Sequence, residues 1–338
     1  MIQSSDDSMP GGCVPHIAHA IPSRNFISRT LLNEHSGNNG LDGASSNPWE
    51  NDRREGRHAV VTPLAKAKGR RASTPMAGQE WREETVKVAG TDLTLLKSGT
   101  GKPLLVLHEE LGHPGWLRWH SELARHRTVT IPLHPGFGKS PRVEWVRNIR
   151  DLAGFYARVI REQGWSPVDV IGFSLGGWIA AEMAACDAKQ FSKMVLVAPT
   201  GIRPPQGDIA DMFIVTARAY LDISVHNIAA NPEFAKLYGG EQSAEQFEAW
   251  EDARAETARI AWQPYMFNPS LGPLLENVVG LPTMILWGKQ DKIAPVSAAH
   301  VFNEAIKGSD LVLLDNCGHR PEVEQTSTFL ERIQRFLA

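Results

Sequence analysis

The pattern of hydrophobic and polar positions changes near residue 80. Residues 1–78 are crowded with Ser, Asn, Gly, Pro and Arg, and neither a helical period of 3.6 nor a strand period of 2 persists there. Such a segment cannot bury enough apolar surface to order itself. We therefore expect a disordered amino-terminal tail that does not carry the chemistry of the protein, with a targeting or docking segment as the alternative.

From Trp81 onward, segments with strand and helix patterns alternate. Residues 84–88 and 91–97 alternate like antiparallel strands around the turn Ala89-Gly90. Further along, short apolar runs predict strands at 103–108, 128–133, 168–173, 193–199, 282–288 and 310–315, and helical patterns separate them at 116–126, 149–163, 176–185, 296–306 and 328–337. This order predicts βαβ units and a mainly parallel sheet, which is an α/β fold.

The alternation stops between residues 201 and 278, where the chain is helical or irregular and rich in large apolar side chains. We expect an α/β core formed by residues 79–200 and 279–338, interrupted by a helical cap at 201–278. In open α/β sheets, ligands bind outside the carboxyl ends of the strands. A cap in this position is therefore expected to cover the ligand site.

The composition of the chain bears on which kinds of molecule the protein binds. The formal net charge of −3 gives no electrostatic reason to expect binding to nucleic acid or to a membrane surface. No apolar run approaches the ~20 residues that a membrane helix needs. The three cysteines are widely spaced and form no disulfide framework, which favours a reducing, cytoplasmic compartment. We expect a small-molecule substrate, and the sequence leaves formation of a homo-oligomer open.

A tight corner is predicted around Ser174. Gly172, Ser174 and Gly176 fit the pattern G-x-S-x-G, with a strand directly before it and a helix directly after it. A sharp strand-to-helix corner forces its central residue to a positive φ, and only small residues fit two positions to either side. The corner presents the serine Oγ at a helix amino terminus, where developing negative charge is favoured.

A serine hydroxyl is a poor nucleophile unless a base removes its proton and an acid orients that base. Asp291 follows the strand at 282–288, and His319 follows the strand at 310–315. Asp291 as a helix N-cap and His319 as a buried structural histidine are the alternatives, and Asp315 is a second candidate for the acid. The chain order Ser174, Asp291, His319 is that of the catalytic triad on an α/β sheet.

With these motifs, residues 80–338 resemble the α/β-hydrolase superfamily. The segment at 133–141 resembles the family motif D-x-P-G-x-G-x-S, with His134 where an acid is common, and Cys317-Gly318-His319 matches a frequent form of the histidine loop. The resemblance implies an α/β-hydrolase fold and a hydrolase that needs no cofactor. The histidines at 108, 113, 120, 126 and 134 fit no familiar spacing of metal ligands, so no metal site is expected.

The segment after the strand at 103–108 departs from the family pattern. An oxyanion hole needs two N–H donors, and we expect them to be the backbone amides of Leu175 and Glu110, with Glu109 as a second candidate. The family usually has glycine where this chain has Glu109 and Glu110. A carboxylate ~6 Å from the oxyanion would oppose it by roughly 3 kcal/mol at an effective dielectric of ~20. At least one of these side chains should therefore point away from Ser174 or be held by a partner.

An acidic pocket also bears on the substrate. It disfavours an anionic dienoate, unless Arg218, Arg254 or Arg259 compensates, and it suits a small to medium, largely apolar carboxylic ester. A carbon–carbon bond hydrolase, a small-molecule sensor without turnover, and a lyase or cofactor-free oxidation on the same fold are the alternatives. The predicted catalytic residues are Ser174, Asp291 and His319, and the predicted substrate contacts are Glu109, Phe173, Trp250, Trp262 and Phe267.

Overall fold

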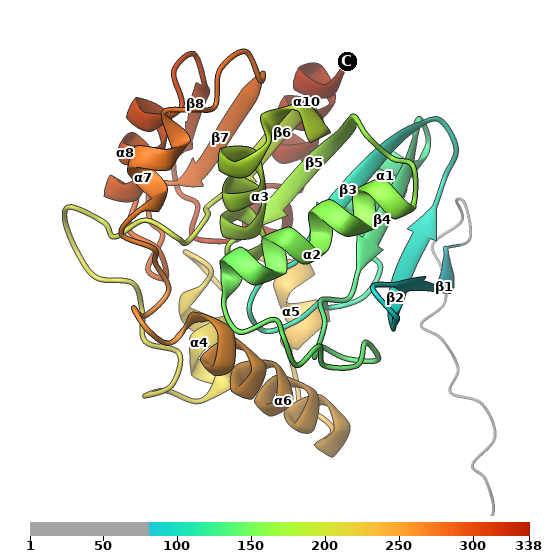
Figure 1. The fold of residues 1–338 in the computed structure, drawn as a ribbon. Helices are drawn as coiled ribbons and strands as arrows, with labels where there is room; N and C mark the ends of the chain where they lie inside the picture. Colours follow the sequence, from blue (N-terminus) through green and yellow to red (C-terminus); the bar gives the residue numbers. More distant parts are fainter. Residues whose placement is uncertain (1–80) are drawn as a thin grey trace, which may run out of the picture. The chain divides into compact units, whose positions relative to one another are not determined.

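A computed structural model describes residues 81–338 of the chain (Figure 1). The predicted tail at 1–78 and Cys13 lie outside these residues. The described part is built on one sheet with the strand order β1-β2-β4-β3-β5-β6-β7-β8. The first two pairings, β1 with β2 and β2 with β4, are antiparallel, and all the others are parallel. The predicted α/β fold with a mostly parallel sheet is confirmed.

The strands lie within a few residues of the predicted runs. They are β1 (Arg82–Val88), β2 (Thr91–Ser98), β3 (Lys102–Leu107), β4 (Arg127–Pro132), β5 (Val168–Phe173), β6 (Phe191–Val197), β7 (Thr283–Gly288) and β8 (Asp310–Leu314). All six residues of β5 and of β7 are buried, as expected of central strands covered on both faces. Between β1 and β2, Ala89 and Gly90 both have positive φ, which is the geometry of a two-residue hairpin turn.

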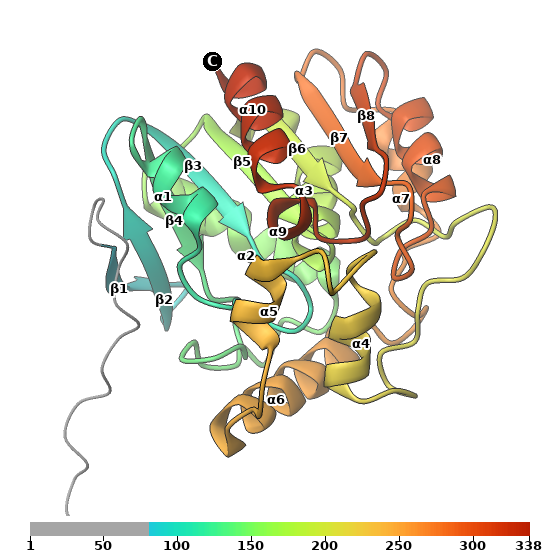
Figure 2. The ribbon, with the colours of Figure 1, turned by 180° about the vertical axis from the view of Figure 1, so that it is seen from behind.

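Helices cover both faces of the sheet (Figures 1 and 2). One face carries α2 (Ile149–Glu162), α3 (Leu175–Cys186) and α8 (Ser297–Ala305), and the other carries α1 (Arg118–Ala124) and α10 (Thr326–Leu337). The sequence predicted each of these helices, although α1 is shorter than expected. It missed the single turn α9 (Pro321–Glu324) and the short 3-10 helix at Ala188–Gln190.

The segment between β6 and β7 is helical, and we call it the helical insert (residues 201–278). It contains α4 (Ala217–Ile223), α5 (Pro232–Tyr238), α6 (Ala244–Ala261) and α7 (Leu271–Leu275). In both ribbon views, α4, α5 and α6 lie beyond one end of the sheet. Hydrogen bonds join the insert to the loops that follow β3 and β8, so this is the carboxyl end of the parallel strands.

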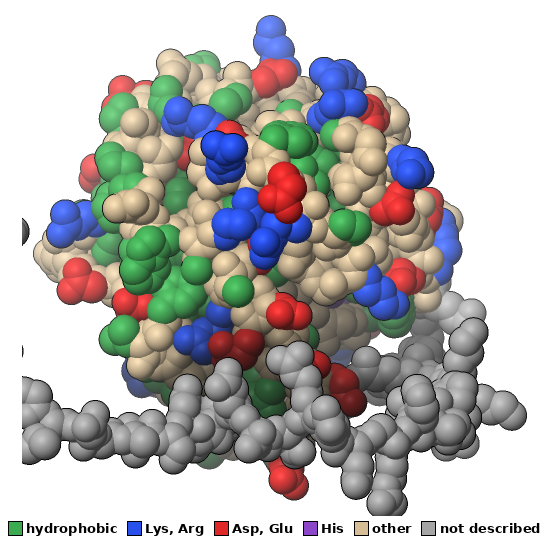
Figure 3. Space-filling model, turned by 60° about the horizontal axis from the view of Figure 1, so that its bottom comes forward, with side chains coloured by type: hydrophobic (Ala, Val, Ile, Leu, Met, Phe, Trp, Pro, Cys, Tyr) green, Lys and Arg blue, Asp and Glu red, His purple; other side chains and the backbone are tan. Residues whose placement is uncertain are grey.

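No helix within residues 81–338 is long and apolar enough to cross a membrane. Figure 3 brings the lower side of Figure 1 forward and shows Lys and Arg side chains interspersed with Asp and Glu, with small hydrophobic groups between them. The visible part of this face therefore offers no extended surface of a single charge sign.

Candidate active site

Ser174 occupies a strained corner between β5 and α3. Its backbone angles are φ 46° and ψ −111°, outside the regions that L-residues ordinarily adopt. A Cβ atom on Gly172 would lie 2.4 Å from Gly176 O, and one on Gly176 would lie 2.2 Å from Leu107 O. Both approaches are closer than atomic radii allow, so glycine is required on each side of Ser174. The structure thus has the corner geometry that the sequence pattern predicts.

Asp291 and His319 are brought together by the loops that follow β7 and β8. The Asp291 Oδ2 atom lies 2.7 Å from His319 Nδ1, and both side chains are buried. Asp291 Oδ1 accepts hydrogen bonds from the backbone N–H groups of Ile293 and Ala294, at 2.8 and 3.0 Å. The carboxylate is therefore fixed on one side by its own loop and presents its second oxygen to the imidazole.

Two of the alternatives for the acid are not supported by this arrangement. The nearest following helix, α8, begins at Ser297, and its first turn is not capped by Asp291. Asp315 has a side chain that is 71% exposed and is paired with Lys289 at 2.8 Å. Cys317, which precedes the histidine loop, is buried, and burial raises the pKa of its thiol, so it is poorly suited to act as a second nucleophile.

The loop that carries His319 is held by residues that the sequence did not single out. His319 N donates to Ser224 O of the helical insert at 2.8 Å. Glu324, in α9, accepts hydrogen bonds from the backbone N–H groups of Gly318 and His226, both at 2.7 Å. No local motif marks Ser224 or Glu324 because their partners are distant in sequence or belong to the backbone.

The charge of His319 depends on two carboxylates. Burial alone would lower its pKa, but the Asp291 carboxylate and, to a lesser degree, Glu110 outweigh burial and raise the pKa to about 9. Arg320 acts in the opposite direction. At neutral pH, the imidazole of the free protein is therefore mostly protonated.

Glu110 is buried in the same site. Its Oε1 atom accepts a 2.6 Å hydrogen bond from the Tyr220 hydroxyl of α4, and its backbone oxygen accepts one from Thr257 Oγ1 of α6 at 2.9 Å. Burial would raise the pKa of this carboxyl group, but the neighbouring His319 and hydrogen bonds from Tyr220 and Ser174 lower it. Ser174 lies near this carboxyl group, but neither Ser174 Oγ nor Glu110 Oε2 has a hydrogen-bond partner of regular geometry within residues 81–338.

Glu109 is held differently. Its Oε1 atom lies 2.6 Å from Arg320 Nη2, and both side chains are at least nine-tenths buried. Arg320 also donates to Ser224 Oγ at 2.8 Å and lies over the ring of Tyr238. Burial raises the pKa of Glu109, and Arg320 offsets only part of that effect. The prediction that a partner holds at least one of the two glutamates is confirmed for both.

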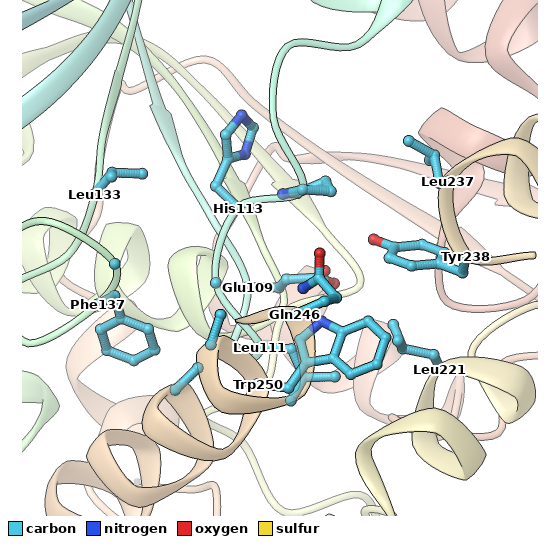
Figure 4. Close-up of a pocket in the computed structure, with 15 residues that line it drawn as sticks. Glu109, Leu111, His113, Leu133, Phe137, Leu221, Leu237, Tyr238, Gln246 and Trp250 are labelled. Atoms are coloured by element: carbon cyan, nitrogen blue, oxygen red, sulfur yellow. The ribbon is translucent and has the colours of Figure 1, made fainter. Parts of the chain in front are cut away.

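A cavity of about 150 Å³ adjoins Glu109 (Figure 4). Leu133 and Phe137 lie on one side of it, Leu221, Leu237 and Tyr238 on the other, and Glu109, Gln246 and Trp250 lie between them. A second, smaller cavity of about 30 Å³ continues past Glu109 to Phe173 and Arg320. Of the predicted substrate contacts, Glu109, Phe173 and Trp250 therefore line these two cavities.

The structure does not bring the other two predicted contacts to these cavities. Trp262 is 51% exposed and packs against Phe213 and Tyr265 on the surface of the insert. Phe267 lines a separate cavity with Trp178 and Glu182. The sequence showed that the insert is rich in aromatic residues, but not which of them face the cavity beside Glu109, because that depends on how the insert packs against the core.

The clustered histidines pack against one another. His108 and His134 stack with ring centroids 3.6 Å apart, and His134 N donates to His108 Nε2 at 3.0 Å. Burial lowers the pKa of His108 to about 4 and that of His113 to about 3, so both are neutral. Within the described part of the chain, no three His, Cys, Asp or Glu side chains are grouped in a way that could hold a metal ion.

Comparison with known proteins identifies the family. A sequence profile of the alpha/beta hydrolase family matches residues 104–332. The chain belongs to the alpha/beta hydrolase family. The predicted fold class and the prediction of a hydrolase are thereby confirmed.

Relatives within the family differ in chemistry. The chain is 26% identical over 280 residues to a 2-hydroxymuconate semialdehyde hydrolase of a Pseudomonas species, covering 79% of this chain and 95% of the relative. It is 23% identical over 267 residues to a 2-hydroxy-6-oxo-2,4-heptadienoate hydrolase of Pseudomonas putida, covering 75% and 95%. A solved membrane phospholipase A, a bacterial virulence factor, superposes with a TM-score of 0.64 at 26% identity, covering 76% of this chain and 86% of that one. Family members similar to this chain thus include both carbon–carbon bond hydrolases and lipid ester hydrolases.

Proposed function

We propose that this chain is a serine hydrolase that cleaves a small to medium, largely apolar carboxylic ester through an acyl-enzyme. The observation that carries the proposal is the 2.7 Å contact of Asp291 with His319 Nδ1, in a site where Glu110 lies near both His319 and a serine held at a strained corner. That contact fixes the imidazole with its Nε2 atom free, and Nε2 has no hydrogen-bond partner within residues 81–338. A general base for the serine hydroxyl needs this atom available to accept a proton, and we propose that the Ser174 hydroxyl turns toward it during the reaction.

In the proposed mechanism, Ser174 Oγ attacks the carbonyl carbon of the ester while His319 takes the hydroxyl proton. His319 then donates that proton to the departing alcohol and afterwards activates the water that releases the acid. Asp291 keeps the imidazole in the productive tautomer and stabilises the imidazolium that forms.

The backbone amides of Leu175 and Glu110 are the proposed oxyanion donors. Leu175 is the first residue of α3, where backbone N–H groups have no acceptor within the helix. Glu110 follows β3, the strand next to β5 in the sheet, so its backbone lies at the same edge as Ser174. A developing negative charge between these donors would also be favoured by the amino terminus of α3.

The helical insert is proposed to act as a cap over this site. Tyr220 and Thr257 join it to the loop of Glu110, and Ser224 joins it to the loop of His319. The cavity beside Glu109 is lined on one side by core residues and on the other by insert residues such as Leu221, Tyr238 and Trp250. Its modest volume and the many apolar side chains among its lining residues support a small acyl or alcohol group.

The positions of the arginines support an ester over a dienoate. Arg218 pairs with Asp222, and Arg259 pairs with Glu256. Arg254 pairs with Glu251 and donates to the backbone oxygens of Met212 and Val215. Arg320 is paired with Glu109. Each of these four cations is already engaged, so none of them is free to pair with a substrate carboxylate, which would also meet Glu109 and Glu110.

A carbon–carbon bond hydrolase using the same triad is the second candidate, because two of the relatives carry names of that activity. It would use the same serine and histidine on a dienoate substrate. The electrostatics of the site weigh against it, and the comparison of substrates described next separates the two activities.

Nitrophenyl esters of graded acyl length, assayed beside a meta-cleavage dienoate, test the proposal. We expect ester hydrolysis with a preference for short acyl chains, and labelling of the protein by a fluorophosphonate. Both should be lost in Ser174→Ala and His319→Ala and retained in Ser327→Ala, which removes an exposed serine hydroxyl. Residual ester hydrolysis within tenfold of wild type in Ser174→Ala would refute the proposed mechanism. Faster turnover of the dienoate would favour the second candidate, and tight ligand binding without labelling would indicate a sensor.

A further inference from the structure

Three polar side-chain atoms meet in the active site without a regular hydrogen-bond partner among residues 81–338. They are Ser174 Oγ, His319 Nε2 and Glu110 Oε2. The proposed mechanism accounts for the first two, since a nucleophile and a base must both be free to react. It does not account for Glu110, whose side chain has no role in that mechanism.

The Glu110 carboxylate is held so that it faces the nucleophile. Tyr220 fixes Oε1 at 2.6 Å, and Thr257 fixes the backbone oxygen of the same residue at 2.9 Å. The residue is 1% exposed, and its side chain lies close enough to Ser174 and His319 for both to lower its pKa. The second carboxylate oxygen therefore has no hydrogen-bond donor of regular geometry among residues 81–338, and the carboxyl group lies near the hydroxyl to which an acyl group would be attached.

Glu109, the neighbour of Glu110, has a charged side-chain partner at hydrogen-bond distance, which Glu110 lacks among the described residues. Both glutamates are buried in the same loop and each has a neighbouring cation, but Arg320 lies 2.6 Å from Glu109, whereas His319 lowers the pKa of Glu110 without a regular hydrogen bond to it among the described residues. The only side-chain hydrogen bond of regular geometry to the Glu110 carboxylate comes, within the described residues, from the neutral Tyr220 hydroxyl. An ionised carboxylate is costly to bury unless hydrogen bonds satisfy its oxygens. His319 and the hydrogen bonds around Glu110 already outweigh this cost and lower its pKa, and a ligand that brings a donor to Oε2 would add a further hydrogen bond to the ionised carboxylate.

We propose that Glu110 is a specificity-determining residue whose carboxylate accepts a hydrogen bond from a hydroxyl or ammonium group on the carbon next to the scissile carbonyl. The inference rests on the proposed function, because it places the carbonyl carbon at Ser174 Oγ. The preferred substrates are then esters of α-hydroxy or α-amino acids with small side chains. A donor in this position would also offset the negative field of Glu110, which otherwise opposes the oxyanion.

Ethyl esters that differ only at the α-carbon test this preference in a pH-stat assay. The probes are ethyl propionate, ethyl lactate and ethyl alaninate. A hydrogen bond to a charged group should increase kcat/KM about 10- to 100-fold for lactate or alaninate over propionate. A preference for lactate identifies a neutral donor, whereas a preference for alaninate that falls as its amine loses its proton identifies a cationic one. Equal values for all three esters in the wild-type protein would overturn the proposal.

The variant Glu110→Gln keeps the backbone amide and an oxygen for Tyr220 but removes the charge. We expect the preference among the three esters to shrink to within about threefold, and to persist in Glu248→Gln, which removes an exposed glutamate charge from α6. A preference that is unchanged in Glu110→Gln would contradict the assignment to this residue. If that variant does not fold, Glu110→Asp provides a second test, since it keeps the charge but withdraws the carboxylate by one methylene and should weaken the preference.

The same assay separates this inference from the proposed function. If the wild-type protein hydrolyses none of the nitrophenyl or ethyl esters and fluorophosphonate does not label Ser174, the proposed function fails. If Ser174 is labelled and ethyl propionate is hydrolysed as fast as the other two esters, only the role of Glu110 fails.

Discussion

Two regions at the same edge of the sheet are stabilised by different physical means. The corner at Ser174 follows β5, and the loop of Glu109 and Glu110 follows its neighbour β3. Excluded volume sets the corner, where a Cβ atom on Gly176 would collide with backbone atoms 2.2–2.6 Å away. Polar partners from distant parts of the chain hold the loop, where Arg320 forms an ion pair with Glu109 and Tyr220 donates a hydrogen bond to Glu110. Substitutions that add atoms should therefore destabilise the corner, and substitutions that remove polar partners should destabilise the loop.

The largest effect is expected from a change of charge without a change of shape, at Asp291. In Asp291→Asn, Oδ1 can keep its backbone hydrogen bonds, but the amide presents an N–H group to His319 Nδ1 and favours the wrong tautomer. We expect kcat to fall about 10⁴-fold with little loss of stability. Steady-state ester hydrolysis and thermal unfolding measure the two quantities, and a fall of less than tenfold in kcat would exclude Asp291 as the orienting acid.

The pH dependence of the same variant gives an independent readout. His319 must be neutral to act as a base, and its pKa is raised to about 9, so kcat/KM of the wild-type protein should rise with pH up to about 9. Removal of the Asp291 charge removes the largest contribution that raises this pKa, so the rise should move to lower pH in Asp291→Asn. If the rise of kcat/KM occurs at the same pH in Asp291→Asn and in the wild-type protein, a group other than His319 causes it.

Removal of Arg320, the cation that pairs with Glu109, is expected to have the next largest effect. Arg320→Met leaves Glu109 buried without its partner, which should lower the free energy of unfolding by about 3–5 kcal/mol. Arg125→Met is the matched control, because Arg125 is 61% exposed and its pair with Glu122 should contribute at most about 1 kcal/mol. Urea unfolding of both variants measures the difference, and equal losses would mean that the pair of Glu109 and Arg320 is not critical for stability.

Addition of one methyl group tests the corner. Gly176→Ala places a Cβ atom against Leu107 O and His108 O, and backbone atoms cannot rotate away, so we expect a loss of about 3 kcal/mol. Gly154→Ala in α2 adds the same methyl group where nothing lies within 4 Å, and should stabilise the protein by about 0.5–1 kcal/mol. The comparison would be contradicted if both variants unfolded at the same urea concentration.

The smallest effect is expected at Tyr220. Tyr220→Phe removes one hydrogen bond to the Glu110 carboxylate and should cost about 1.5 kcal/mol in the free energy of unfolding. The ring stays buried in the insert, so the contribution of packing is preserved. Double-mutant analysis with Glu110→Gln isolates the pair, and a coupling energy near zero would show that the hydrogen bond contributes nothing to stability.

Much of the core could be predicted because its signals are local. The strand β5 is a run of six buried residues and was predicted to the residue, and the glycines around Ser174 follow from steric limits within five positions. The chain order of Ser174, Asp291 and His319 follows from their places after the strand patterns at 168–173, 282–288 and 310–315. Parallel strands bring their carboxyl ends to one edge, so these patterns also predicted that the three residues would lie near one another.

The rest depended on how the helical insert folds against the core. The sequence raised the question of two carboxylates beside Ser174, but it gave no sign that Arg320 holds Glu109 or that Tyr220 holds Glu110. It also predicted Trp262 and Phe267 as substrate contacts, and the structure places neither of them beside the cavity at Glu109.

The sequence by itself determined the type of fold, the strained corner and the set of candidate catalytic residues. Each of these depends on backbone sterics or on the period of apolar residues, which act over a few positions. Only the tertiary structure decided the charges in the site, since the partner of a buried carboxylate can come from anywhere in the chain. Tyr220 lies 110 residues from Glu110, and the energy of that contact depends on burial that no local pattern encodes.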